Sequence, residues 1–265
     1  MLNLSAIIPH PTALIPELKN EQISQFKKTT KSLALLKKEL AKEKPKTIIL
    51  ISPHGSMRYD KFTINLENRL QGSFSAFGSE AEEMNFSGNS ELAKQIFTIC
   101  RSLHLPIDLI REPNLDYASL LSLYYLLDQS EETPAIIPVT YTAFDYQMHY
   151  IFGKAIGKAI AGINEPVVIL ASGDLSHRLT KDAPAGFSPY GKKFDETLID
   201  LLENNQVEKI LGLNPDFADE AQECALRSVI IALGSMFNQK KIAFRKLSYE
   251  APLGVGHLVG YWKFN

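Results

Sequence analysis

The sequence predicts an α/β protein, a single-domain sandwich in which helices cover both faces of a mixed central sheet. Short apolar runs that are typical of buried strands alternate along the chain with segments whose apolar residues recur at helical spacing. The last two predicted strands follow each other directly, so we expect them to pair antiparallel. No internal repeat, low-complexity tract or linker divides the sequence, which indicates one domain over residues 1–265.

The predicted strands are short and strongly apolar. The runs "TIILIS" at Thr47–Ser52 and "VVILASGD" at Val167–Asp174 have the continuous apolar character of strands that are buried on both faces. The other predicted strands are Leu4–Pro9, Phe62–Leu66, Pro134–Thr142, Lys241–Tyr249 and Gly254–Lys263.

Helical spacing of apolar residues, with lysines on the opposite face, predicts a helix over Gln22–Glu43. Ser90 is a residue type that caps helix N-termini and predicts the start of another helix. The stretch Arg69–Gly88 is rich in Gly, Ser and Asn, so we expect a long surface loop there. The further predicted helices run from Ser90 to about Leu105 and over Ala118–Leu127, Gln147–Ile163, Lys192–Asn204 and Asp216–Met236.

The composition argues against several classes of protein. Lys and Arg total 28 and Asp and Glu total 30, so no basic excess indicates a nucleic-acid or membrane partner. The longest apolar runs are too short to span a bilayer, and the N-terminus does not have a signal-peptide pattern. The two cysteines, Cys100 and Cys224, lie far apart in sequence, which predicts a reducing, cytoplasmic location rather than a disulfide framework.

Three histidines follow predicted buried strands: His10 in "IIPHP", His54 in "ILISPHG" and His177 in "ILASGDLSH". In open α/β sheets, sites form at the carboxyl ends of the strands. A proline before His10 and before His54 restricts the backbone, which suits ligands that must be held in position. A single loop histidine is more often only hydrogen-bonded to backbone, but three at strand ends favour a shared site.

A metal site built on these histidines needs a further ligand. Two histidines and one carboxylate on one side of a metal leave positions open for O2 and substrate, the pattern of non-haem Fe(II) oxygenases. We expect structural roles for His104 and His149, whereas the role of His257 stays open because a strand of the central sheet can carry it to the site. The candidate carboxylates are Glu17, Asp174, Glu223 and Glu250.

Glu223 stands out among these carboxylates because it lies in "AQECALRS", inside an otherwise apolar run that is predicted to be helical and ends "VIIALGSM". An acid in such a run is costly to bury unless it is paired or bound to a cation. Arg227, four residues on, offers the ordinary explanation of a helical ion pair. The neighbouring Cys224 is a rival, either as a thiolate ligand or as a small buried residue.

The segments "PHPTALIPE", "ISPHG", "ASGDLSHRL" and "ECALRS" resemble the LigB-like superfamily, the class III extradiol ring-cleavage dioxygenases and their relatives. The segment "SYEAPLGVGHLVGYW" is similar to the C-terminus of uncharacterised bacterial members associated with the AmmeMemoRadiSam group. The resemblance covers essentially the whole chain, with the motifs in the same order. It implies an Fe(II) cofactor, with Zn as the alternative, and a small catechol-type aromatic substrate and O2 as partners. It leaves a homo-oligomer open.

The resemblance also implies residue roles. His10 and His54 match the metal-binding histidines, Glu223 best matches the third ligand, and His177 matches the histidine that assists proton transfer around the substrate hydroxyl. The related Memo proteins use a cysteine in this region, which would fall on Cys224. Many relatives have a histidine in a mid-chain "DHG" stretch where this chain has Tyr117 in "NLDYASL".

Tyrosine has an ordinary pKa near ~10 and is therefore a poorer acid–base group than histidine at neutral pH. Tyr117 in place of this histidine therefore weighs against standard catechol cleavage. The expected function is an Fe(II)-dependent extradiol dioxygenase. The alternatives are a Memo-like metal- or peptide-binding protein without dioxygenase activity, and a Zn-dependent hydrolase that uses the same ligands.

Overall fold

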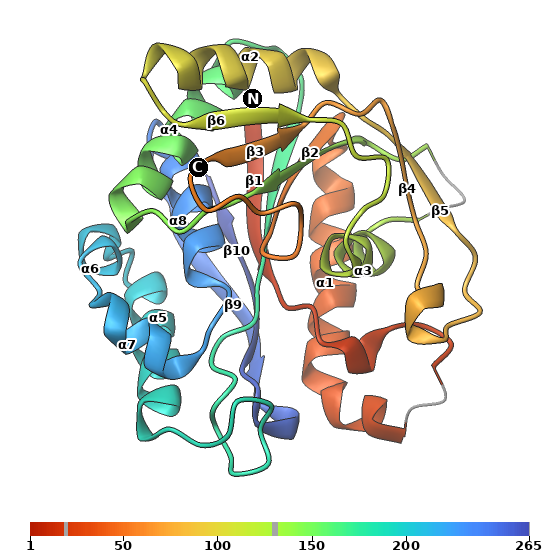
Figure 1. Ribbon diagram of the computed structural model, residues 1–265, viewed down its shortest axis with the longest axis vertical. Coiled ribbons are helices and arrows are strands. Elements are labelled where there is room, and N and C mark those ends of the chain that lie inside the picture. The colour runs from red at the N-terminus through yellow and green to blue at the C-terminus, as the bar shows by residue number, and fades with distance from the viewer. Residues whose placement is uncertain (19–20, 129–131, 265) are drawn as a thin grey trace.

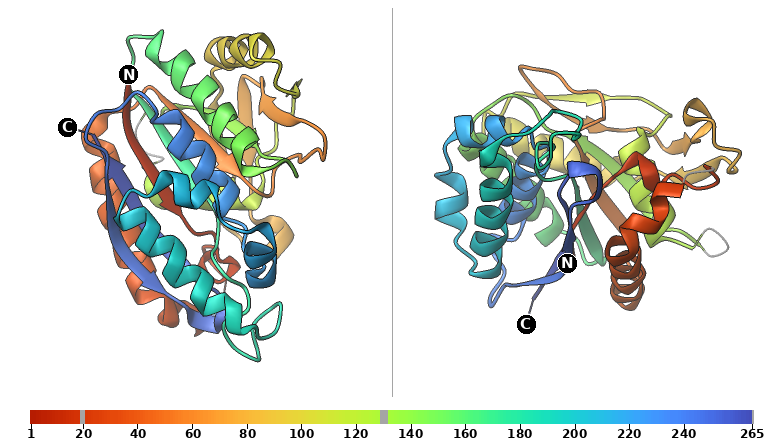
Figure 2. Two further views of the ribbon diagram at one scale, coloured as in Figure 1. Left: turned by 90° about the vertical axis from the view of Figure 1, so that its left-hand side faces the viewer. Right: turned by 90° about the horizontal axis from the view of Figure 1, so that it is seen from below.

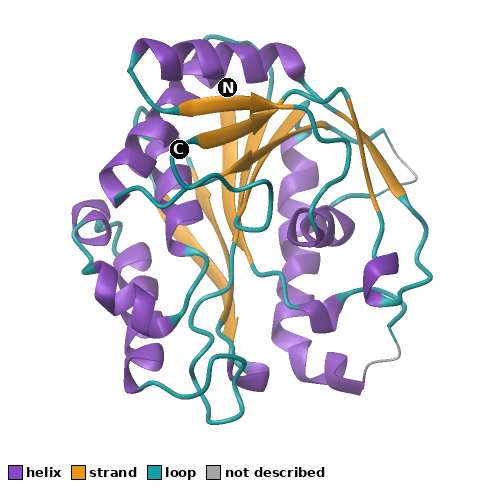
Figure 3. Ribbon diagram, viewed as in Figure 1, coloured by secondary structure: helices purple, strands orange, loops and turns teal. Residues whose placement is uncertain are grey.

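Eight strands form one mixed sheet in the order β6-β3-β7-β2-β8-β1-β10-β9, and β4 and β5 pair separately (Figures 1 and 3). The computed structural model describes residues 1–18, 21–128 and 132–264. Helices cover both faces of the large sheet, as the sequence predicts. The strands are β1 Leu2–Ile8, β2 Thr47–Ser52, β3 Phe62–Asn65, β4 Arg69–Gly72, β5 Met84–Ser87, β6 Ile107–Ile110, β7 Ala135–Thr140, β8 Val167–Ser172, β9 Ala243–Glu250 and β10 His257–Lys263.

The four central strands β7, β2, β8 and β1 run parallel, so their carboxyl ends lie at one edge of the sheet. The segments that follow β1, β2 and β8 are those that carry His10, His54 and His177. Strand β10 runs antiparallel to β1, and β9 is antiparallel to β10, as expected for the last two strands. Because of that direction, His257 at the start of β10 lies at the same edge.

Two layers of helices bury the two faces of the sheet (Figure 2). Helices α2, α4, α5, α6, α7 and α8 pack on one face, and α1 and α3 pack on the other with the β4–β5 hairpin. None of the helices in the described part of the chain combines the length and the apolar character needed to cross a membrane. The α-helices are α1 Lys27–Glu43, α2 Ser90–Ser102, α3 Tyr117–Leu126, α4 Tyr146–Ala161, α5 Pro189–Glu203, α6 Val207–Leu211, α7 Pro215–Ala221 and α8 Leu226–Ser235.

The helix predicted over Asp216–Met236 is two helices, α7 and α8, and the prediction of one continuous helix is wrong. Gln222 has a φ of 52°, in the left-handed region, and ends α7. The carboxylate of Glu223 then accepts a hydrogen bond from the backbone N–H of Leu226 at the start of α8. Glu223 and Cys224 therefore lie in a tight connection between helices and not on a helix face.

The prediction of a surface loop over Arg69–Gly88 is wrong at both ends, where β4 and β5 pair as a hairpin beside α3. Residues 73–83, between the two strands, form a largely exposed loop with one 3-10 turn. Buried and exposed residues alternate along both strands, with Leu70 and Phe86 turned inward. Each strand has only four residues, which is too short for the alternation to outweigh the polar composition.

Other differences concern helix starts and two short elements. The first predicted helix begins as a 3-10 turn over Glu21–Phe26 before α1. Asn89, not Ser90, caps α2, because its side chain accepts a hydrogen bond from the N–H of Leu92 at 3.0 Å. The short elements β6 and α6 were not predicted.

Helices α4 and α8 pack with their backbones unusually close. A Cβ atom on Gly153 would lie 2.1 Å from the carbonyl oxygen of Ile231, and one on Gly157 would lie 2.4 Å from that of Ser235. Real Cβ atoms do not approach backbone oxygen so closely. The glycines of α4 therefore allow the contact that fixes α8, and with it the Glu223–Cys224 connection, against the sheet.

Substitution of Gly153 tests this packing. Alanine favours an isolated helix by about 1 kcal/mol, yet Gly153→Ala should destabilise the protein by about 1–3 kcal/mol because the methyl group meets the α8 backbone. Gly162→Ala at the end of α4, where the nearest atom would be 3.3 Å away, is the matched control and should change stability by less than about 0.5 kcal/mol. Urea unfolding measures both. Equal losses in the two variants would contradict the packing argument.

Candidate active site

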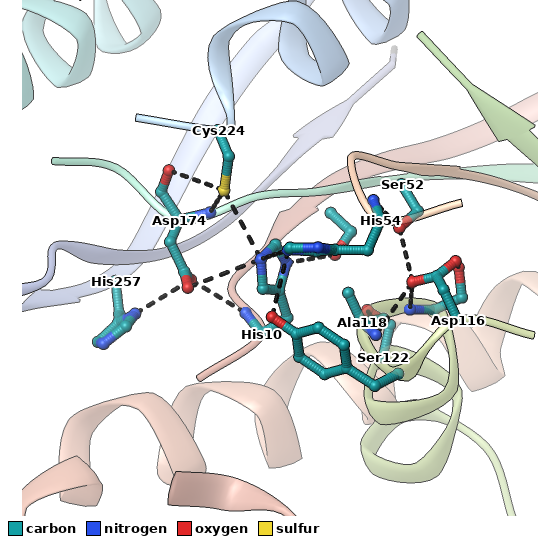
Figure 4. Close-up of polar contacts among 12 residues, drawn as sticks. His10, Ser52, His54, Asp116, Ala118, Ser122, Asp174, Cys224 and His257 are labelled. Carbon is teal, nitrogen blue, oxygen red and sulfur yellow. Dashed lines mark hydrogen bonds and ion pairs between the residues drawn. The ribbon is translucent and has the colours of Figure 1, made fainter. Parts of the chain in front are cut away.

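His10 and His54 meet edge to face at the carboxyl edge of the sheet, with ring centroids 4.8 Å apart (Figure 4). Their Nε2 atoms lie 3.2 Å from each other. A metal bound to both nitrogens at the usual ~2.1 Å would subtend an angle of ~100° between them, which is ordinary coordination geometry. The pair therefore fits one shared divalent ion.

His10 is fixed by contacts at the end of β8. Its Nδ1 lies 2.9 Å from the hydroxyl of Ser172, and its backbone N–H donates to Oδ1 of Asp174 at 3.0 Å. The residue is only 2% exposed. Burial lowers the pKa of His10 to about 4, although the charge of Asp174 opposes the shift. The ring is thus neutral near pH 7, and in the tautomer that donates its Nδ1–H to Ser172 the Nε2 lone pair faces His54.

The segment that carries His54 is tied to α3 through a serine. Ser52 accepts a hydrogen bond from the His54 backbone N–H at 3.1 Å and donates to Oδ1 of Asp116 at 2.8 Å. Asp116 caps α3 by accepting bonds from the N–H groups of Ala118 and Ser119, both at 3.0 Å. Partial burial lowers the pKa of His54. One carboxylate thus links the His54 segment to the start of the helix that presents Tyr117.

The hydroxyl of Tyr117 lies 3.2 Å from Nε2 of His54. Its ring is 4.8 Å from the His54 ring and 5.8 Å from the His10 ring, measured between centroids. Burial and the nearby acidic groups, Asp174 first, raise the pKa of Tyr117 well above its ordinary value. The hydroxyl therefore keeps its proton at neutral pH and is a hydrogen-bond donor beside the histidine pair.

Asp174 is a buried carboxylate at the centre of the site. Besides the His10 backbone N–H, its Oδ1 lies 3.1 Å from Nδ1 of His257, and its Oδ2 lies 3.7 Å from Nε2 of His10. Burial would raise the pKa of Asp174, but His10 and His257 beside it hold that pKa below its usual value. His257, whose role was open, thus lies at the site as the partner of Asp174.

Cys224 and Glu223 point to different surroundings. The Sγ atom of Cys224 lies 3.6 Å from Nε2 of His10 and accepts a bond from the Asp174 N–H at 3.2 Å. The carboxylate of Glu223 accepts a bond from the Leu226 N–H at 2.6 Å. Burial raises the pKa of Glu223 to about 7 and the pKa of the Cys224 thiol well above its ordinary value. This arrangement brings Cys224, rather than Glu223, next to His10.

The donor chemistry suits a divalent transition metal, because two imidazoles and a thiol are ligands of Fe and Zn. Across residues 1–18, 21–128 and 132–264, however, no group of three or more His, Cys, Asp and Glu side chains is already arranged to hold a metal ion. The Nε2 atoms of His10 and His54 lie as close together as two ligands of one ion, and Sγ of Cys224 lies 3.6 Å from Nε2 of His10.

His177 lies in the loop after β8, where its backbone N–H donates to the carbonyl of Ala221 at 3.0 Å. A positive charge on the His177 ring would lower the pKa of both His10 and His54, so the three imidazoles lie near one another. Among the described residues, its Nδ1 atom is buried and has no hydrogen-bond partner. An unpartnered buried ring nitrogen has an unused capacity to exchange a proton with a ligand.

The remaining candidates have other surroundings. Glu250 accepts hydrogen bonds from the N–H groups of Lys28, at 3.3 Å, and Thr29, at 2.7 Å, near the start of α1. The ring nitrogens of His149 lie 2.7 Å and 3.1 Å from backbone carbonyl oxygens, as expected for a structural histidine. Glu17 and His104 are exposed.

Sequence reasoning missed Ser52, Ser172 and Asp116 as parts of the site. Each had a local signal. The two serines end strands directly before the site segments, and Asp116 precedes a helix, where Asp is a preferred N-cap. What the sequence lacked was the register of the strands, which pairs Ile8 with Ser172 and so brings that hydroxyl to His10.

The chain belongs to the LigB family: the model for the catalytic LigB subunit of aromatic ring-opening dioxygenase matches residues 4–260. A solved structure of an uncharacterized Escherichia coli protein has the same fold, with a TM-score of 0.66 at 15% identity over 98% of this chain and 99% of that one.

The curated proteins that are similar in sequence include the three described here. A Clostridium acetobutylicum protein whose name assigns no activity is 34% identical over 265 residues, which cover 97% of this chain and 56% of that protein. The Escherichia coli 3,4-dihydroxyphenylacetate 2,3-dioxygenase is 27% identical over 161 residues, 57% of this chain and 58% of the enzyme. The beta subunit of a Pseudomonas sp. 2-aminophenol 1,6-dioxygenase is 20% identical over 282 residues, 97% of this chain and 92% of the subunit. The chain spans little more than half the length of the first two relatives.

A second buried carboxylate, Asp195 of α5, supports the loop that carries His177. Its Oδ1 accepts a bond from the Ser176 N–H at 2.8 Å, and its Oδ2 accepts one from the Tyr249 hydroxyl at 2.6 Å. The residue is fully buried. Burial raises the pKa of Asp195 to about 6, although both hydrogen bonds favour the charged form.

This raised pKa predicts a pH dependence of stability. The native state holds the Asp195 proton more tightly than the unfolded chain, so the free energy of unfolding should fall as the pH rises from about 4 to about 6, and stay lower above that. The contribution is on the order of 2–3 kcal/mol. Asp195→Asn keeps an acceptor for the Ser176 N–H but cannot titrate. In urea unfolding, the difference between the free energies of unfolding at pH 4.5 and pH 7 should therefore be smaller in this variant by this amount. Superimposable profiles for the two proteins would refute the assignment.

Proposed function

We propose that this chain is a metal-dependent extradiol dioxygenase that opens a catechol-type aromatic ring with O2. The observation that carries the proposal is the pair of Nε2 atoms 3.2 Å apart at the carboxyl edge of the sheet, in a chain of the LigB family. The names of two relatives support it, because 3,4-dihydroxyphenylacetate and 2-aminophenol each carry two adjacent polar atoms on the ring.

The residues that would hold the metal are His10, His54 and a third donor. Bound Fe(II) would supply binding of two adjacent ring oxygens and of O2. The distance of 3.6 Å from His10 Nε2 favours Cys224 as the third donor, whereas the family resemblance favoured Glu223. Asp174 and Ser172 orient the His10 ring through its backbone and its Nδ1 atom, as outer partners of metal ligands commonly do.

Two other side chains act on the substrate oxygens, one by proton transfer and one by hydrogen bonding. His177 takes a proton from a substrate hydroxyl at its Nδ1 atom, which has no hydrogen-bond partner within the part of the chain that the structure describes. Tyr117, protonated at neutral pH, donates a hydrogen bond toward the substrate oxygen on which negative charge develops. The tyrosine stabilises charge where many relatives have a titrating histidine.

The thiol beside His10 supports a second candidate function. Thiolate and imidazole together suit zinc as well as iron. A zinc-loaded chain would be a Memo-like metal- or peptide-binding protein without dioxygenase activity, or a hydrolase.

Metal identity after anaerobic purification and O2 uptake with a panel of catechols separate these functions. Bound iron with catechol-dependent O2 uptake supports the dioxygenase. Bound zinc and no uptake with the iron-reconstituted protein supports the second candidate.

The third donor can be assigned with two neighbouring substitutions. Cys224→Ser should lower metal affinity by at least about tenfold, the smallest loss usually seen even for outer partners of metal ligands. Glu223→Gln should keep the metal, because its carboxylate bonds to the α8 backbone. Elemental analysis and chelator competition measure both, and His10→Ala is the control that should abolish stoichiometric binding. Metal loss in Glu223→Gln with retention in Cys224→Ser would instead assign Glu223.

If Tyr117 stabilises developing charge, its substitution should change turnover and leave the metal content unchanged. Tyr117→Phe should lower kcat about 10²-fold, the scale for removal of one donor to a developing charge, with metal content and the unfolding midpoint unchanged. Tyr117→His should raise cleavage, because imidazole titrates nearer neutral pH. Steady-state kinetics on a cleaved catechol measures both. If neither substitution changes the rate, Tyr117 serves only in packing.

A further inference from the structure

An aromatic side chain from the β4–β5 hairpin lies over Tyr117. Phe77 is the last residue of the 3-10 turn Ser75–Phe77 at the tip of the hairpin, and it is 40% exposed. Its ring centroid lies 5.3 Å from that of Tyr117, which is itself 4.8 Å from that of His54. An aromatic surface therefore extends from solvent to the histidine pair.

The hairpin tip is held in place by contacts on both sides of Phe77. Phe74 is buried, and its ring lies 6.3 Å from that of Tyr124 on α3. The hydroxyl of Ser79 donates to the carbonyl of Pro16 at 2.7 Å, which ties the tip to the segment after β1. Phe77 is thus presented by an anchored turn and has little freedom to leave Tyr117.

We propose that Phe77 and Tyr117 form the aromatic wall of the substrate site, with Phe77 at its solvent-exposed end. This inference rests on the proposed dioxygenase function and adds a residue that positions the substrate ring. An aromatic ring whose adjacent oxygens face His10 and His54 stacks on Tyr117 and reaches Phe77 with the edge that carries its substituents.

The test uses catechol, which is titrated anaerobically into the iron-loaded protein by calorimetry, with the metal-free protein as a control.

Substitutions at the hairpin tip test the wall itself. Phe77→Ala should weaken catechol binding about three- to tenfold, the range expected for loss of one aromatic pair, and Phe77→Tyr should restore it. Tyr190→Ala removes a similarly exposed aromatic, packed beside Phe217 on the opposite face of the sheet, and should leave binding unchanged. Urea unfolding confirms that the variants are folded.

The outcomes separate this inference from the function beneath it. If Phe77→Ala binds catechol like the parent, the inference is overturned and the dioxygenase proposal stands. If catechol does not bind the iron-loaded protein, the dioxygenase proposal fails and the inference fails with it.

Discussion

The buried carboxylate of Asp174 joins the parts of the site that come from distant places in the sequence. It accepts the backbone N–H of His10 and contacts the ring of His257, so it fixes the segment after β1 and the start of β10. Its own backbone N–H donates to the Cys224 thiol, and its carbonyl accepts the Cys224 N–H at 3.0 Å. A buried charge of this kind is tolerated only with such partners, so the loop geometry and the carboxylate stabilise each other.

Parallel pairing of the central strands brings the residues of this network to one edge of the sheet. Because β1, β2 and β8 end at one edge, the residues that follow them need only short loops to converge. The prolines before His10 and His54 further limit the backbone conformations that these two segments can adopt. The close packing of α4 on α8 then sets the depth at which the Glu223–Cys224 connection reaches the same edge.

The strands, most helices and the clustering of His10, His54 and His177 could be predicted because they depend on local apolar patterns and on a general rule about sheet edges. The hairpin could not, because β4 and β5 are short and gain their stability from contacts with α3 that are distant in sequence. The break between α7 and α8 could not be predicted from the sequence for another reason. Gln222 adopts a left-handed backbone that non-glycine residues rarely choose without tertiary support.

That single backbone conformation decides which side chain faces the His10–His54 pair. A continuous helix would place Glu223 and Cys224 about 100° apart on its surface, and either could face His10. With the left-handed turn at Gln222, the Glu223 carboxylate is used as an acceptor for the Leu226 N–H, and the Cys224 thiol is left beside His10. Recruitment of Glu223 to a metal would require loss of that hydrogen bond and a new path for residues 222–225. The choice between a carboxylate and a thiolate ligand, and with it the preference for a harder or softer metal, is therefore a choice between two backbone conformations of this connection.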